Sequence, residues 1–218
     1  MNKKNFLLIL CLLLPSLVIG CKQPETSQQQ ASSPFAATQT TTLPGWKKFE
    51  GRGAQLQLPE SYRGGDISKN LDVVVQELES WGPYYQQVAQ FLKQNPSAYA
   101  IWAHDSKVGK AGFLTNVAIA VESVGSTVTT DTYLDMITKQ LPSEIRVVEQ
   151  KKVSLGGYQA GQIGTETIIP NGTSVKQIVY TIKQGSNMWT VAFTTSAEEF
   201  EQRLPSFQQS INTFSASD

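Results

Sequence analysis

The sequence offers one residue pair with the chemistry of a metal or proton-transfer site, His104 followed by Asp105. Imidazole and carboxylate are both metal ligands, but a metal ion such as zinc needs three or four ligands, and no suitably spaced companions accompany this pair. A serine hydrolase triad would have to use the same residue, the single histidine of the chain, and no G-x-S-x-G turn presents a serine. We therefore expect no enzyme and no cofactor. His104 is then a hydrogen-bonded residue at the end of a strand, and a metal site with Asp105 is the alternative.

The N-terminus has the order of regions that is typical of a signal peptide. Two lysines precede the apolar residues 6–19, and the run breaks at Gly20 before Cys21. The motif Val18-Ile19-Gly20-Cys21 resembles the lipobox of bacterial lipoproteins, which implies cleavage after residue 20 and a diacylglycerol and a fatty acid such as palmitate on Cys21. A membrane-spanning helix needs about 20 apolar residues, and here Pro15 interrupts a shorter run. We expect a protein that its lipid holds on the extracytoplasmic face of a bacterial membrane.

Removal of residues 1–20 sets the composition of the mature chain. Cys11 leaves with the signal peptide, and lipid occupies the sulfur of Cys21, so we expect no disulfide and no thiolate site. The net charge becomes about −2, which gives the chain no electrostatic attraction for nucleic acid. Residues 22–45 are rich in glutamine, serine, threonine and proline and hold few apolar side chains to bury. We expect residues 21–45 to be the lipidated cysteine and a flexible tether.

Residues 46–218 have the length and patterning of one folded domain. Runs of apolar and β-branched residues, several of them alternating with polar ones and bounded by turn residues, predict strands over Trp46–Phe49, Ala54–Leu58, Tyr99–His104, Phe113–Val124, Ile145–Leu155, Tyr158–Ile169, Thr173–Lys183 and Met188–Thr195. Apolar residues spaced by three and four predict helices over Leu71–Gln94, Thr130–Leu141 and a C-terminal stretch that ends near Phe214. Short turns such as Gly156-Gly157 join the last four strands as hairpins, so we expect an antiparallel sheet.

The most distinctive segment is the amphipathic stretch Leu71–Gln94. Gly82-Pro83 in its middle must break or kink it, because proline lacks an amide donor and clashes with the preceding turn. We expect two short helices or one bent helix. The stretch contains residues of the types enriched at interface cores: Trp81, Tyr84, Tyr85 and Phe91. Two interpretations stay open, since the stretch either packs on the domain or presents these aromatic side chains to a partner.

The last third of the chain has an order of elements that points to a known family. Two long strands within Tyr158–Lys183 precede the strand Met188-Trp189-Thr190-Val191-Ala192-Phe193, and a helix ends in Ser210-Ile211-Asn212-Thr213-Phe214. This order resembles the PsbP family, extrinsic proteins of photosystem II, whose fold is shared by a nuclear-import factor that binds Ran and by several envelope lipoproteins. The resemblance implies an α+β fold, an α/β/α sandwich with a central antiparallel sheet and helices on both faces. Relative to compact members, residues 66–95 look like a helical insertion.

The resemblance and the residues support hypotheses of different kinds. Cyanobacterial members of the PsbP family are lipoproteins on the lumenal side of the thylakoid membrane, which implies a non-enzymatic accessory role. In the first hypothesis the tethered domain docks on a membrane protein complex or assists its assembly, with photosystem II as the implied complex, in the thylakoid lumen or on the cell membrane. In the second, the domain binds a small ligand or a metal, and the helical insertion covers a pocket lined by Tyr84, Tyr85, Trp102 or His104. An enzyme, the third hypothesis, would have to use His104.

Overall fold

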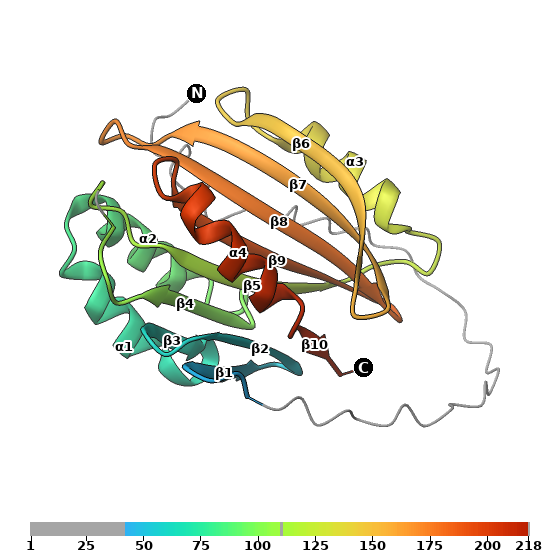
Figure 1. Ribbon diagram of the computed structural model, residues 1–218, viewed down its shortest axis with the longest axis horizontal. Helices are drawn as coiled ribbons and strands as arrows, with labels where there is room; N and C mark the ends of the chain where they lie inside the picture. Colours follow the sequence, from blue (N-terminus) through green and yellow to red (C-terminus); the bar gives the residue numbers. More distant parts are fainter. Residues whose placement is uncertain (1–41, 110, 218) are drawn as a thin grey trace.

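The computed structural model describes residues 42–109 and 111–217 (Figure 1). Its strands are β1 (Trp46–Gly51), β2 (Ala54–Pro59), β3 (Tyr62–Asp66), β4 (Ile101–Asp105), β5 (Asn116–Ser123), β6 (Arg146–Leu155), β7 (Tyr158–Ile168), β8 (Ser174–Gln184), β9 (Asn187–Ser196) and β10 (Ser215–Ala216). Its helices are α1 (Ile67–Glu79), α2 (Pro83–Gln94), α3 (Thr130–Gln140) and α4 (Phe200–Ile211).

Seven strands form one antiparallel sheet in the order β3-β4-β5-β9-β8-β7-β6. Its longest strands, β6 to β9, follow one another as hairpins, as their patterning and turn residues predict. Gly156 and Gly157 between β6 and β7 have φ angles of +54° and +93°, and a type I′ turn requires positive φ at both central positions. The prediction of an α+β fold with a central antiparallel sheet is therefore confirmed.

The first two strands do not join the central sheet. β1 and β2 form a hairpin, and β10 pairs with β2, so these three strands make a second sheet. The sequence predicts β1 and β2 but misses β10, which has two residues, and β3. β3 contains Gly64 and Gly65, at φ +110° and +137°. Glycine has no side chain to contribute to an alternating pattern, so this edge strand carries no signal in the sequence.

One face of the central sheet carries the small sheet and α4, and we call it the α4 face (Figure 1). Side chains from both sheets and from α4 form one continuous apolar core there. Phe193 of β9 stacks on Phe207 of α4, with ring centroids 5.0 Å apart, and Trp189 meets the ring of Phe214 edge to face. This core packs the first strands of the domain against its last helix.

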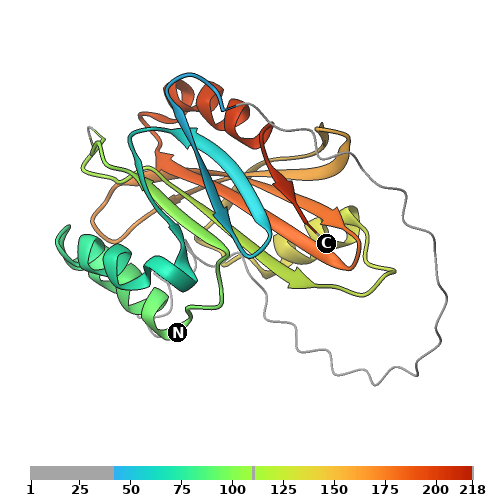
Figure 2. The same cartoon turned by 90° about the horizontal axis from the view of Figure 1, so that it is seen from below.

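The opposite face carries α1, α2 and α3, and we call it the three-helix face (Figure 2). Its apolar side chains fall into separate clusters, of which one joins α1 and α2 to β4 and β5 and another joins α3 to β7 and β9. Gly161 of β7 lies beneath α3, where an added Cβ would come within 2.3 Å of Leu134 Cδ1. Helices thus lie on both faces of the sheet, as expected.

The stretch expected to be helical forms two helices with a sharp turn between them. Asp66 caps α1, because its Oδ1 accepts a hydrogen bond from the Ser68 amide at 2.9 Å. α2 begins at Pro83. The first residue of a helix has no intrahelical partner for its backbone amide, so the amide hydrogen that proline lacks costs no hydrogen bond at this position. Gly82 before it has a φ angle of +100°. The predicted break at Gly82-Pro83 is confirmed.

Candidate functional site

We call α1, α2 and the turn between them the helical pair. The structure separates its four aromatic residues into buried and accessible ones. Tyr85 and Phe91 of α2 lie in the apolar cluster beneath α1 and α2, each with 6% of its surface exposed. Tyr84 is partly buried against Phe113, whereas Trp81 is the one exposed aromatic side chain in the part of the chain that the structure describes. Tyr85 and Phe91 cannot contact a partner in this conformation, which corrects the prediction for these two residues. For Trp81 and Tyr84 it stays a prediction.

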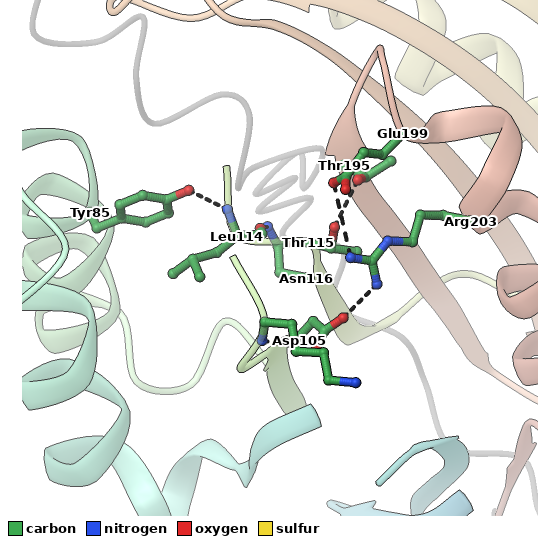
Figure 3. A network of polar contacts seen from close by, with 9 residues as sticks. Tyr85, Asp105, Leu114, Thr115, Asn116, Thr195, Glu199 and Arg203 are labelled. Carbon is green, nitrogen blue, oxygen red and sulfur yellow. Dashed lines mark hydrogen bonds and ion pairs between the residues drawn. The ribbon is translucent and has the colours of Figure 1, made fainter. Parts of the chain in front are cut away.

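Tyr85 has a structural role that its sequence position does not reveal. Its hydroxyl oxygen accepts a hydrogen bond from the backbone amide of Leu114, at 2.6 Å, and so ties α2 to the chain just before β5 (Figure 3). Its ring also meets the ring of Tyr84 edge to face, with centroids 4.9 Å apart. Trp102, from β4, belongs to the same buried cluster as Tyr85. The side chains that were expected to line a ligand pocket therefore serve largely as core beneath the helical pair.

His104 and Asp105 do not form one ligand set. They are consecutive residues of β4, and successive side chains of a strand point to opposite faces of the sheet. His104 lies beside Trp102 on the three-helix face, with ring centroids 5.4 Å apart, and Asp105 pairs with Arg203 of α4 on the other face. Within residues 42–109 and 111–217, no group of three or more histidine, cysteine or acidic side chains could hold a metal ion. This geometry corrects the prediction of a metal site shared by His104 and Asp105.

The environment of His104 is unusual for a histidine. The side chain is 0% exposed, and its Nε2 lies 3.2 Å from Oε1 of Glu77 on α1. Nε2 thus has the Glu77 carboxylate as its partner, whereas Nδ1 makes no hydrogen bond to the described residues. Burial lowers the pKa of His104, and although Glu77 and Asp105 favour the charged form, the pKa stays below its usual value.

Asp105 is the centre of an ion-pair cluster that fastens α4 to the central sheet (Figure 3). Arg203 donates a hydrogen bond through Nη1 to Asp105 Oδ2, and its Nη2 lies 4.0 Å from Glu199 Oε2. Burial alone would raise the pKa of Asp105, but hydrogen bonds from Arg203, the Lys107 amide and Ser61 outweigh it and hold the pKa below its usual value. Asp105 is therefore an anion that the fold has already paired.

A row of hydrogen-bonding side chains crosses the three-helix face. The strand register places on adjacent strands, one after another, Arg63, His104, Asn116, Thr194, Gln177 and Thr165. Gln177 Nε2 donates to Thr194 Oγ1 at 2.8 Å. Asn116, Ala118 and Ala192 are only partly buried although they lie on inner strands of the sheet. The sequence alone does not reveal this row, because single polar positions on separate strands carry no signal until the register aligns them.

The predicted anchor lies outside the described residues. Cys21, the expected lipidation site, precedes residue 42, as do the expected signal peptide and most of the tether. In the part of the chain that is described, no helix has the length and apolar character needed to cross a membrane.

No protein-family model matches this sequence, and no curated protein matches it. Solved structures do resemble it. Cyanobacterial PsbP (CyanoP) from Synechocystis sp. PCC 6803 has a TM-score of 0.51 at 8% identity, over 85% of this chain and 100% of that one. LpqN from Mycobacterium tuberculosis, a protein involved in cell envelope biogenesis, has a TM-score of 0.50 at 13% identity, over 76% and 83% of the two chains.

Identities this low show the fold alone. The observed order of strands and helices, the antiparallel central sheet and the two covered faces agree with the architecture that the C-terminal motifs imply. The chain therefore has the α+β fold of CyanoP and LpqN.

Proposed function

We propose that this protein is a non-enzymatic accessory lipoprotein, anchored by lipid on Cys21, on the extracytoplasmic face of a bacterial membrane. It docks on a membrane protein complex or assists its assembly, and photosystem II is the first complex to test. The observation that carries this proposal is the combination of a lipobox-like motif ending at Cys21 with a domain whose fold resembles cyanobacterial PsbP. The likeness to LpqN, an envelope-biogenesis protein, supports a location outside the cytoplasm.

Trp81 is the side chain on which we place the docking contact. It lies between α1 and α2, at the tip of the helical pair, and 39% of its surface is exposed. Tryptophan is among the residues that most often dominate the energy of an interface, since it buries a large ring with few rotatable bonds. The buried neighbours Tyr85 and Phe91 hold the two helices in place, so that the docking residue sits on a rigid support.

The test is affinity purification of the tagged full-length protein from gently solubilised membranes of its native host. We expect a near-stoichiometric complex with the wild type, and release of Cys21→Ala into the soluble fraction. Trp81→Ala should stay on the membrane but lose about 2 kcal/mol of binding energy, roughly a thirtyfold weaker complex. Val148→Ala, a change of an exposed side chain on β6, is the matched control and should keep the complex. If Trp81→Ala retained every partner, the docking role of the helical pair would be wrong.

The row of polar side chains favours a second candidate function, binding of a small uncharged ligand. Amide and hydroxyl groups of Asn116, Thr194 and Gln177 both donate and accept hydrogen bonds, and the small Ala118 and Ala192 on the adjacent part of the sheet are only partly buried. In a titration of the full-length protein with neutral disaccharides, followed by NMR, we expect saturable shifts of the Ala118 and Ala192 amides. Asn116→Leu should abolish these shifts, whereas Asn171→Leu, in an exposed hairpin tip, should not. Unchanged amides would leave this candidate without support.

A further inference from the structure

The buried imidazole of His104 lies where the helical pair meets the central sheet. Glu77, whose carboxylate lies beside Nε2, sits on the inner side of α1 between Val74 and Leu78, which are both buried in the cluster beneath the helices. On the sheet side, His104 is paired in register with Arg63 of β3 and Asn116 of β5. The contact between His104 and Glu77 thus joins α1 to β4 of the central sheet.

A second proton on His104 would have no acceptor. In the neutral ring, the hydrogen on one nitrogen can face Glu77 across 3.2 Å, and the other nitrogen stays bare. Protonation places a hydrogen on Nδ1 as well, and this atom is buried and makes no hydrogen bond to the residues that the structure describes. A buried charged group with an unsatisfied donor costs free energy that the protein recovers only by moving the ring toward water.

The charged groups around the ring do not remove this cost. Glu77 from α1 and Asp105 from β4 both favour the protonated ring, but Asp105 points to the other face and is already paired with Arg203. Arg63 from β3 opposes protonation. Burial outweighs the two carboxylates, so that the pKa of His104 lies below its usual value.

We propose that His104 and Glu77 form an acid-sensitive latch between α1 and the central sheet, and that protonation of His104 loosens the α1–α2 pair. The neutral ring fits the closed arrangement, and the charged ring fits an arrangement in which α1 has moved away and water reaches the imidazole. Tyr85 and Trp102 lie in the same cluster, so opening exposes aromatic surface that is covered at neutral pH. This inference does not depend on the proposed docking function.

The sign of the effect follows from the lowered pKa. A group with a lowered pKa in the folded state stabilises that state above its unfolded pKa, about 6.5 for histidine, and this contribution is lost as the pH falls. In the window between that value and the folded pKa, each pH unit raises the ratio of open to closed molecules by up to about tenfold. Because His104 is the single histidine in the chain, its titration is directly observable without ambiguity of assignment.

The test is hydrogen–deuterium exchange of the full-length protein in detergent micelles, from about pH 7.5 to about pH 5.5, combined with an NMR titration of His104. After correction for the intrinsic pH dependence of exchange, we expect residues 67–94 to lose protection by about tenfold relative to α3, which lies over other strands. His104→Phe, which cannot titrate, should show the same protection at both values of pH.

Two carboxylate-to-amide variants on α1 separate the latch from a general effect of acid. Glu77→Gln removes the anion that favours the charged ring in the closed arrangement, so it should lower the pKa of His104 and increase the loss of protection in acid. Glu79→Gln, which changes an exposed residue paired with Lys93, should leave both unchanged. The inference is overturned if protection of residues 67–94 does not change relative to α3, if His104 titrates at or above its usual pKa, or if the two variants behave alike.

Discussion

Replacement of Arg203 by methionine is expected to lower the free energy of unfolding by about 3 kcal/mol, because it leaves the Asp105 carboxylate buried without its partner. The carboxylate is 3% exposed, and Arg203 reaches it from α4, across 98 residues of sequence. Loss of one member of a buried ion pair typically costs about 3–5 kcal/mol. Because 22% of the Arg203 side chain is exposed, the pair is only partly shielded from water, and we expect a cost at the lower end of this range. Urea unfolding of the variant and the wild type at neutral pH measures the difference.

Two comparisons make this result specific to the buried pair. Lys151→Met removes the partner of Glu149 where both side chains are about half exposed, so its effect should stay within about 0.5 kcal/mol. The double variant Asp105→Asn with Arg203→Met should regain part of the loss, because no uncompensated charge is left. An Arg203→Met protein as stable as Lys151→Met would show that the pair contributes nothing.

The pH dependence of the same pair has a definite sign. In the wild type the lowered pKa of Asp105 means that its contribution is present above about pH 4 and is lost as the pH falls further. In Arg203→Met the carboxyl stays buried without its ion-pair partner, and burial favours the protonated form. The stability difference between the two proteins should therefore shrink in acid.

Replacement of Gly64 by alanine is expected to cost about 3 kcal/mol or more through two separate effects. Gly64 has a φ angle of +110°, which side chains rarely adopt, and a Cβ at this position would lie 2.4 Å from the backbone oxygen of Trp102. Backbone strain of this kind costs about 1–3 kcal/mol, and a clash with main chain, which cannot rotate away, adds about 1–3 kcal/mol. The change should separate β3 from β4, the pair that holds Arg63 opposite His104.

Gly125→Ala is the control for this substitution. The nearest atoms to a new Cβ at Gly125 lie 3.9 Å and 4.0 Å away, which is ordinary contact distance. This variant should be within about 0.5 kcal/mol of the wild type, since alanine there also restricts the unfolded chain. Thermal and urea unfolding of both variants measure their changes in stability relative to the wild type. A Gly64→Ala protein with wild-type stability would contradict the geometric argument.

The aromatic residues of the helical pair show why residue type in the sequence does not by itself identify a surface that contacts a partner. Tyr85 and Phe91 fall on the apolar side of α2, so the same periodicity that predicts a helix also predicts their burial. Trp81 continues the same spacing of apolar residues in the sequence, but it lies in the turn between α1 and α2 and stays exposed. The hypothesis that these aromatic side chains contact a partner therefore applies to Trp81, with Tyr84 beside it, and not to the buried Tyr85 and Phe91.

The sequence by itself determined the local elements of the domain. The strands β6 to β9 lie within two residues of their predicted bounds, since each is long, rich in β-forming residues and closed by glycine or asparagine turns. Proline and glycine likewise placed the break between α1 and α2. Short turns between successive strands also predicted antiparallel pairing, because a hairpin depends only on neighbours in the chain, while the α+β class was what the resemblance to the PsbP family implied.

Only the tertiary structure decided which distant residues meet. The pairing of Asp105 with Arg203, the second sheet made by β1, β2 and β10, and the place of Glu77 over His104 all depend on contacts between distant segments. Side-chain pattern reports the burial of a position and not the identity of its neighbour, so no local rule predicts these contacts. The alternative of a metal site shared by His104 and Asp105 fails for this reason, because adjacency in a strand sends the two side chains to opposite faces, where each meets a different helix.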